Sequence, residues 1–239
     1  MPDFKCRSTA LEIMDDLDCS GEVVDQTLRE LEFINTWLGG NQVTIGALQL
    51  LLKKSESKDS IRIADLGCGG GDMLRLIHRW ANKNNIAVEL TGIDANVNIV
   101  NFAKQNLKDI PQIRLIAMDI FSDEFRSMKF DIVIGTLFYH HFSDEQLSIF
   151  FRQLSHQSSL GYILNDIHRH PLAYYSIRLL TRLFSKSAMV KFDAPLSVLR
   201  AFKKRELISI FSQAHTSSYS IQWKWAFRWQ VVVKTERRA

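Results

Sequence analysis

Hydrophobic residues along the chain follow two alternating patterns from residue 61 onward. Short apolar runs, such as IRIADL at 61–66 and FDIVIG at 130–135, are typical of parallel strands buried on both faces. Between these runs lie segments such as DMLRLIHRWANK at 72–83, in which apolar residues recur at the spacing of a helix face. Such alternation predicts an α/β fold in which helices cover both faces of a Rossmann-like parallel sheet.

Two further stretches lie outside this alternation. The segment EVVDQTLRELEFINTWLGG at 22–40 has a helical stripe of apolar residues and ends in a glycine pair suited to a C-cap, and TIGALQLLLKK predicts a second helix. We therefore expect residues 1–58 to form an N-terminal helical cap, with a polar linker at 55–60, and residues 59–239 to form the main domain. A helical insert is expected after the fifth strand, at about 168–202.

The first predicted strand runs directly into a turn with three alternating glycines, Gly67, Gly69 and Gly71. Glycine lets the backbone turn tightly and approach a ligand closely, so a nucleotide-like ligand is expected here. The spacing departs from the dinucleotide fingerprint GxGxxG, and the lysine and hydroxyl residue of a phosphate-binding loop are replaced by Asp72 and a methionine. Asp65, just before the turn, would repel a pyrophosphate and attract an ammonium group, which favours a cofactor with an amino acid end.

The ends of the next two predicted strands carry further acids. Asp94 closes VELTGID, and an acid at the end of the second strand typically accepts hydrogen bonds from ribose hydroxyls. The third strand is followed by Met118, Asp119 and Ile120, where an apolar slot and one polar acceptor could hold a purine and its amino group. The two sites together indicate a nucleoside ligand.

At these residues the chain resembles the class I S-adenosylmethionine-dependent methyltransferases, over roughly Ile61 to Asp166. The segments DLGCGGGD, GID, AMDIF and FDIVIGTLFYHHF are similar to the family's first four motifs, in the same order. The resemblance implies a doubly wound, seven-stranded sheet with its last strand antiparallel. It also implies S-adenosyl-L-methionine as cofactor, S-adenosyl-L-homocysteine as product, and no metal. The residues expected at the cofactor are Asp65, Gly67, Gly69, Gly71, Asp94, Ala95, Met118, Asp119, Ile120 and Thr136.

Composition sets further limits. The chain has 239 residues and is 46% hydrophobic, which is enough for a single large domain with a full core. Its three cysteines, Cys6, Cys19 and Cys68, lack paired spacing and indicate reduced thiols rather than disulfides or a zinc site. No stretch is apolar enough for a membrane span, and the first residues lack the pattern of a signal peptide. We therefore expect a cytoplasmic protein.

Charge is unevenly distributed, although the net formal charge is only +4. Residues 1–40 carry nine acids and three bases, whereas residues 171–239 carry thirteen bases and three acids. The simpler interpretation is that the acidic segment folds against the basic one or is solvated. The functional interpretation is that the basic C-terminal part forms a surface for an anionic substrate, a carrier or a peripheral membrane contact.

Several segments favour a small-molecule acceptor over a nucleic acid. Methyltransferases that modify DNA bases or protein amides resemble one another in an Asn or Asp, two prolines and an aromatic residue after the fourth strand, where this chain has TLFYHH. The insert HRHPLAYYSIRLLTRLF, together with EIMDDLD near the start and DAPLSVLRAF later, is similar to methyltransferases found beside bacterial type III polyketide synthases. This narrower resemblance implies phenolic lipids as acceptors.

The expected reaction is methyl transfer to the oxygen of a phenolic or polyketide-derived compound. Carbon methylation of a quinone-type acceptor shares the fold and the need for a base. A methyltransferase for RNA or protein is supported only by the basic end of the chain. A non-catalytic member that binds the cofactor as a structural element is disfavoured, because the motif acids and glycines are all present.

Methylation of oxygen requires removal of the acceptor's proton, and histidine has a pKa suited to this task near neutral pH. The candidates follow the fourth and fifth predicted strands and are His140, His141 and His168. Asp166 could orient His168, or it could simply end the strand. Three tyrosines, Tyr139, Tyr174 and Tyr175, are candidates to stack on an aromatic acceptor. Tyrosine side chains more often fill a core or form part of a lid.

Overall fold

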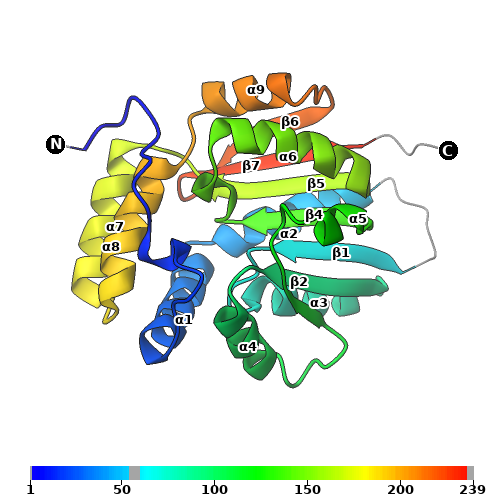
Figure 1. Ribbon diagram of the computed structural model, residues 1–239, viewed down its shortest axis with the longest axis horizontal. Coiled ribbons are helices and arrows are strands. Elements are labelled where there is room, and N and C mark those ends of the chain that lie inside the picture. The colour runs from blue at the N-terminus through cyan, green and yellow to red at the C-terminus, as the bar shows by residue number, and fades with distance from the viewer. Residues whose placement is uncertain (1, 54–59, 236–239) are drawn as a thin grey trace.

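The computed structural model describes residues 2–53 and 60–235, and its centre is a sheet of seven strands (Figure 1). The strands are β1 (Ile61–Leu66), β2 (Val88–Asp94), β3 (Arg114–Ala117), β4 (Phe130–Thr136), β5 (Ser158–Ile167), β6 (Tyr219–Lys224) and β7 (Arg228–Lys234). Their order across the sheet is β3-β2-β1-β4-β5-β7-β6, and β1 to β5 pair in parallel. Strand β7 runs antiparallel to both β5 and β6. This arrangement confirms the predicted Rossmann-like sheet with an antiparallel last strand.

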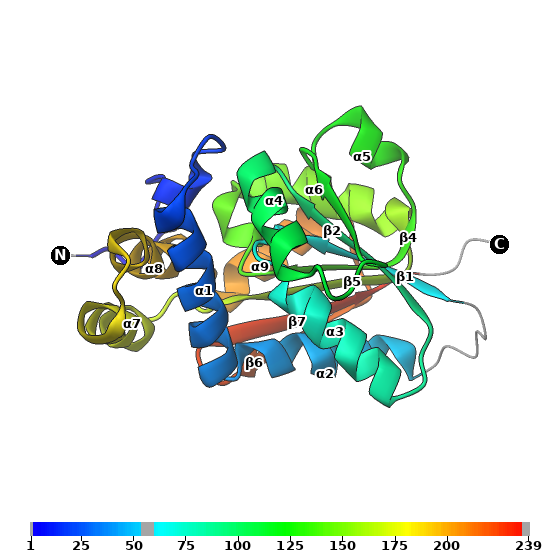
Figure 2. The same cartoon turned by 90° about the horizontal axis from the view of Figure 1, so that it is seen from below.

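The helices lie in layers around this sheet. In the described chain they are α1 (Glu22–Trp37), α2 (Gly40–Leu52), α3 (Asp72–Lys83), α4 (Val97–Asn106), α5 (Asp123–Ser127), α6 (Asp144–Gln157), α7 (Pro171–Phe184), α8 (Ala188–Arg200) and α9 (Lys204–Gln213), with 3-10 turns at Ile13–Asp15 and Tyr139–His141. Figure 2 shows α2 and α3 on one face of the sheet and α5 and α6 on the other. In both views α1, α7 and α8 gather at one end of the sheet, where the parallel strands finish.

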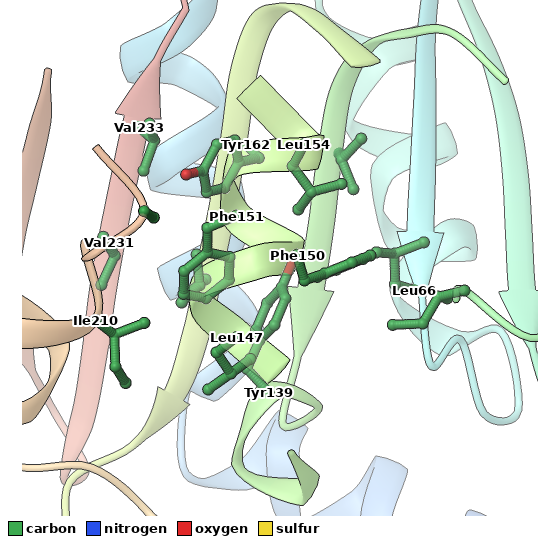
Figure 3. Close-up of a cluster of buried hydrophobic side chains, with 14 of the residues drawn as sticks. Leu66, Tyr139, Leu147, Phe150, Phe151, Leu154, Tyr162, Ile210, Val231 and Val233 are labelled. Carbon is green, nitrogen blue, oxygen red and sulfur yellow. The ribbon is translucent and has the colours of Figure 1, made fainter. Parts of the chain in front are cut away.

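Strand β4 is buried on both faces because alternate side chains enter two separate hydrophobic clusters. Ile132 and Ile134 belong to a cluster with residues of α2 and α3, whereas Val133 belongs to a cluster with residues of α6 and α9. The second cluster contains the fully buried rings of Phe150 and Phe151 (Figure 3). Burial on both faces explains why this strand reads as a continuous apolar run.

Two residues, Pro171 and His170, favour the start of helix α7 at this position. Pro171 occupies the first position, where a missing N–H leaves no hydrogen bond unmade, and the ring of His170 accepts a backbone N–H of the first turn at 3.2 Å. The helix ends at Phe184. Helix α8 follows at once, and the two helices occupy the predicted insert at 168–202.

The two leader helices have different positions. Helix α2 packs on the sheet against β5 and β7, whereas α1 contacts α8 at the carboxyl edge of the strands. The leader therefore contributes one helix to a layer of the sheet and one to the wall of that edge. The expected domain boundary near residue 58 and the linker at 55–60 lie outside the described residues, apart from Ser60. A division of the chain at that point stays a prediction.

Gly67 follows β1 and lies directly against an aromatic ring. Its φ is +61°, and a Cβ there would lie 2.2 Å from Cδ2 of Phe138. We expect Gly67→Ala to lower the free energy of unfolding by about 2–4 kcal/mol, because the backbone would be strained and the ring displaced. Urea unfolding of the variant and the wild type measures this difference.

The matched control is Gly39→Ala. Gly39 is left-handed, with a φ of +73° and a ψ of +10°, but nothing lies within 4 Å of the position its Cβ would take. This variant should lose only the cost of a left-handed residue, about 1–2 kcal/mol. If the two variants lost the same free energy of unfolding, the ring of Phe138 would move without cost, and the packing argument would be contradicted.

Candidate active site

A cavity of about 850 Å³ lies at the carboxyl edge of the parallel strands. Its floor is the loop after β1 and the ends of β2 and β4, and its walls come from the N-terminal segment, α1, α7 and α8. The hairpin between β6 and β7 contributes residues 225–228. Open α/β sheets bind ligands at this edge, and the volume is within the range of small-molecule sites.

The glycine loop brings backbone groups to the cavity floor. Gly69 has a φ of +51°, and its N–H donates to Oδ2 of Asp94 at 3.2 Å. Oδ1 of Asp94 accepts the backbone N–H of Asn96 at 3.1 Å. These two bonds fix the Asp94 carboxylate at the end of β2, where it lines the cavity and can accept further hydrogen bonds.

Three carboxyl groups surround this loop, and none makes an ion pair within the described part of the chain. Asp65, Asp72 and Asp94 line the cavity, and Oδ1 of Asp65 is buried without a hydrogen-bond partner among the described residues. Burial raises the pKa of Asp65 well above its ordinary value, and the charges of Asp72 and Asp94 add to this effect. Burial and the charge of Glu32 raise the pKa of Asp72 to about 6. A ligand with a positive group would relieve this repulsion.

The other predicted cofactor residues line the cavity with one exception. Residues 118–120 follow β3 and present two buried apolar side chains with an acid between them. Thr136, at the end of β4, shares a hydrogen bond of 3.0 Å with the hydroxyl of Thr44. Gly71 does not line the cavity; it is the N-cap of α3, and a Cβ there would lie 2.5 Å from Leu107.

His140 forms a buried ion pair with Asp166. Its Nδ1 lies 2.7 Å from Oδ1 of Asp166, and its backbone N–H donates to Oδ2 at 3.1 Å. Burial lowers the pKa of His140, but the charge and hydrogen bond of Asp166 outweigh it and raise the pKa to about 9. His140 is therefore an imidazolium at neutral pH. Asp166, for which the sequence left open a contact with His168 or a place at the end of the strand, pairs with His140.

The second histidine pairs with the N-terminal segment. Nδ1 of His141 lies 2.6 Å from Oδ1 of Asp15, and Oδ2 of Asp15 accepts a hydrogen bond from Arg200 at the end of α8. Burial opposes ionisation of Asp15, but the hydrogen bonds from His141 and Arg200 hold its pKa below the ordinary value. In a neutral ring whose Nδ1 donates to Asp15, Nε2 of His141 is an acceptor.

Glu12 lies between the two pairs. Its Oε1 is 3.6 Å from Nε2 of His140 and 3.7 Å from Nε of Arg200, and Ser197 donates to its Oε2 at 2.8 Å. One ligand atom each from Glu12, His140 and His141 lies within 4.8 Å of the others, which is the spacing of a possible metal site. Because His140 holds a proton and the Arg200 cation adjoins Glu12, we interpret this group as an ion-pair network.

No role was predicted for Glu12, Asp15 or Arg200. They lie in EIMDDLD and DAPLSVLRAF, the two segments on which part of the narrower family resemblance rests. Asp193 joins these segments, since its carboxylate accepts two backbone N–H groups of the 3-10 turn Ile13–Asp15 at 2.8 and 3.2 Å. The signal was therefore present in the sequence, without any indication that the two segments touch. The acidic N-terminal segment does contact a base of the C-terminal part, as the simpler interpretation of the charges expected.

Four of the predicted catalytic and substrate-binding residues do not line the cavity. The ring of His168 packs against Trp229, with ring centroids 4.7 Å apart. Burial, together with neighbouring positive charges, lowers the pKa of His168 to about 4. The ring of Tyr139 is fully buried in the cluster beside α6 (Figure 3). Tyr174 and Tyr175 pack on each other, with ring centroids 5.2 Å apart. These four residues do follow a strand or lie in the insert, as predicted, but their side chains do not line the cavity.

Residues 63–157 match a family model described as a methyltransferase domain. Solved structures with a similar fold include human N-acetylserotonin methyltransferase with S-adenosylmethionine, at 17% identity and a TM-score of 0.61, with 89% of this chain and 56% of that chain covered. The plantazolicin methyltransferase BpumL, with a triazolic desmethylPZN analog and S-adenosylhomocysteine, is similar at 16% identity and a TM-score of 0.62, over 88% and 90% of the two chains. The citrinin polyketide synthase CMeT domain is similar at 14% identity and a TM-score of 0.60, over 82% and 52%.

Residues 63–157 thus match a methyltransferase domain, and the fold around them is similar to that of methyltransferases solved with S-adenosylmethionine or S-adenosylhomocysteine. The chain spans about half the length of the human and polyketide synthase chains that it matches. The family model ends at residue 157 and begins after the leader. The N-terminal segment, α7 and α8, which form the walls of the cavity, therefore lie outside the matched region.

Asp72 should make cofactor binding depend on pH. Its pKa of about 6 is that of the free site, and only the ionised carboxylate would attract an ammonium group on a ligand. We expect the affinity for S-adenosylhomocysteine to fall as the pH drops below about 6, by at most about tenfold per pH unit. Isothermal titration calorimetry between about pH 5 and pH 8 measures this change.

Asp72→Asn should bind more weakly at neutral pH and should show a flatter dependence below about pH 6, because the titrating group is gone. Asp123→Asn is the control, since the Asp123 side chain is 95% exposed on α5 and its profile should match the wild type. If Asp72→Asn kept the full pH dependence of the wild type, another group would be responsible.

Proposed function

We propose that the protein transfers the methyl group of S-adenosylmethionine to an oxygen of a small phenolic or polyketide-derived acceptor. The observation that carries this proposal is that the pair of His141 and Asp15 lies in the same cavity as the acids of the glycine loop. Displacement on a sulfonium proceeds in line, and the acceptor hydroxyl must lose its proton. Donor and base are therefore needed in one enclosed space.

The residues of the cavity floor fit the parts of the cofactor by their chemistry. Asp94 would accept hydrogen bonds from the ribose hydroxyls, and Asp119 would accept one from the adenine amino group between its two apolar neighbours. The unpartnered Oδ1 of Asp65 would accept a hydrogen bond from the ammonium group, directly or through water. Bound in this way, the cofactor supplies an electrophilic methyl group.

The acceptor would lie against the apolar wall of the cavity. Helix α1 and its C-cap contribute Leu31, Ile34 and Leu38 to this wall, and α7 contributes Ile177 and Leu180. Apolar surface favours an aromatic or lipid-like molecule, whereas RNA would need a basic groove along its phosphates. The similarity of fold to a polyketide synthase domain is consistent with such an acceptor.

His141 is the base that the contacts favour. Its Nδ1 proton is held by Asp15, so Nε2 can take the proton of the acceptor hydroxyl while the carboxylate stabilises the resulting imidazolium. His140 is already protonated at neutral pH and would act by holding Asp166 and the end of β5 in place. His168 lies outside the cavity.

Carbon methylation of a quinone-type acceptor stays the second candidate, because it would use the same donor and the same base. No observation favours RNA or protein as the acceptor. None of the described helices is long and apolar enough to cross a membrane. A cytoplasmic location and a contact with a carrier or a membrane surface stay predictions.

Incubation with S-adenosylmethionine that carries a deuterated methyl group, and with a panel of alkylresorcinols and hydroxylated polyketide aromatics, tests the proposed reaction. Mass spectrometry should show the gain of one labelled methyl group, and NMR should place it on oxygen. A methyl group on ring carbon would favour the second candidate. Absence of transfer to every phenol of the panel, in a protein that binds the cofactor, would contradict the proposal.

His141→Ala should lower kcat about 10²–10⁴-fold, because the general base is lost, and should leave the affinity for S-adenosylhomocysteine within about twofold. Asp15→Asn should lower kcat in the same direction. His168→Ala is the control and should keep the turnover of the wild type, since its ring contacts Trp229 outside the cavity. Full activity in His141→Ala would remove this residue as the base.

A further inference from the structure

Arg228 is a buried cation with an unused donor. It begins β7, is only 5% exposed and lines the cavity. Its Nη2 donates to Oδ1 of Asn35 at 2.8 Å, whereas Nη1 has no acceptor among the described residues. A guanidinium removed from water without a full set of acceptors is costly, so a ligand that supplies them would be bound strongly.

The surroundings hold this guanidinium in one position. A Cβ on Gly40 would lie 3.1 Å from Nη2, so the glycine leaves the room that the side chain occupies. Burial lowers the pKa of Arg228 to about 10, against the opposing charge of Asp166, and the group stays a cation at neutral pH. The side chain makes no ion pair within the described part of the chain, and its fork geometry is suited to a planar oxyanion.

We propose that Arg228 binds a carboxylate of a ligand in this cavity, with Nη1 as the donor. The inference rests on the proposed function, which supplies two possible sources of that carboxylate. One is the methionyl end of the cofactor, whose ammonium group is assigned to Asp65. The other is an acid group on the acceptor, such as that of an aromatic carboxylic acid.

Calorimetry with two ligands separates these sources. S-Adenosylhomocysteine carries the amino acid carboxylate, and 5′-methylthioadenosine lacks it. If the cofactor is the source, Arg228→Gln should bind S-adenosylhomocysteine at least about tenfold more weakly and 5′-methylthioadenosine with unchanged affinity. If the acceptor is the source, the variant should bind both with wild-type affinity. In that case, with S-adenosylhomocysteine present, 2,4-dihydroxybenzoate should raise the melting temperature of the wild type and resorcinol should not. The variant should show no rise with 2,4-dihydroxybenzoate.

Two further variants keep the test independent of folding. Asn35→Ala releases the guanidinium from its only described side-chain acceptor and should weaken the same ligand to a smaller extent. Arg126→Gln removes an exposed guanidinium on α5 and should change nothing. The inference would be overturned if Arg228→Gln bound S-adenosylhomocysteine with wild-type affinity and also bound 2,4-dihydroxybenzoate as the wild type does. Binding of S-adenosylhomocysteine by the wild type tests the proposed function separately.

A second inference starts from the outer face of α7, which is apolar and exposed. Leu172, Tyr175, Leu179 and Leu183 recur at helical spacing and are 64%, 52%, 58% and 64% exposed. Only Ala173 and Thr181 of this helix are buried. Soluble surfaces rarely present such a stripe without a partner.

The exposed stripe continues into the cavity. Ser176 and Leu180 line the cavity, and on a helix they lie at most about a quarter turn from the exposed leucines. Trp225 also lines the cavity and is 68% exposed, so it lies where the cavity meets the surface. A lipid-like acceptor could therefore pass from an apolar surface layer to the cavity without crossing water.

Charge identifies the partner of this face. Residues 171–192 contain Arg178, Arg182, Lys186 and Lys191, all exposed, and no acid. A second copy of the chain, related by twofold symmetry, would bring these bases against one another. Exposed leucines beside arginines and lysines are the composition of helices that lie in the plane of an anionic bilayer.

We infer that the outer face of α7 binds the surface of an anionic lipid bilayer. Flotation of the full chain with vesicles of phosphatidylcholine and about 30% phosphatidylglycerol should recover the protein, and pure phosphatidylcholine should recover far less. The double variant Leu179→Ser, Leu183→Ser should lower recovery on the anionic vesicles about tenfold or more, while its affinity for S-adenosylhomocysteine stays at the wild-type value.

Ile149→Ser is the matched control, because Ile149 is 58% exposed on α6 and should not contribute. Equal recovery with both kinds of vesicle, or equal binding by the double variant and the wild type, would overturn the inference. So would a concentration-dependent dimer in light scattering that the double variant abolishes, since a second copy would then be the partner.

Discussion

A network of buried charges at the carboxyl edge of the sheet holds the walls of the cavity together. His140 and Asp166 join the turn after β4 to the end of β5, while Glu12, Asp15 and Arg200 join the N-terminal segment to α8. Removal of one partner from a buried ion pair typically costs about 3–5 kcal/mol, because the other charge stays out of water. The same groups that could act on a proton therefore also fix the segments around the ligand.

The charges in the cavity divide into those that are paired and those that are not. Within the described chain, the network of His140 and Glu12 satisfies most of its own groups, whereas Asp65, Asp72 and the Nη1 of Arg228 have no partner of opposite charge in contact. A ligand that carries both a positive and a negative group would complement both kinds of unpaired site. The methionyl end of the cofactor has this character, so pairing within the protein distinguishes structural charges from those available to a ligand.

Much of the fold and of the cofactor half of the site could be predicted from the sequence, because both follow local rules. Strand and helix patterns determine where each strand ends, and the carboxyl ends of parallel strands meet at one edge. Asp65, Asp94 and residues 118–120 could therefore be placed together without knowledge of any long-range contact.

The rest of the site, which includes the buried charge network, depends on contacts between segments that are distant in the sequence. Glu12 meets Arg200 across 188 positions of the chain, and no periodicity predicts such a meeting. Position after a strand was also insufficient for side chains that turn away from the edge. Tyr139 follows β4 as His140 does, yet its ring packs over Gly135 in the core while His140 reaches Asp166.

The walls of the cavity differ in how firmly they are held, and this difference bears on how an acceptor enters. Helix α8 buries six of its residues and carries Asp193 and Arg200, which bind the N-terminal segment. Helix α7 buries only two and presents its leucines to the outside. Local opening costs less where few apolar contacts are lost, so displacement of α7 would require less free energy than displacement of α8. Of these two walls, the one that opens at the lower cost is thus the one whose surface is suited to an apolar acceptor.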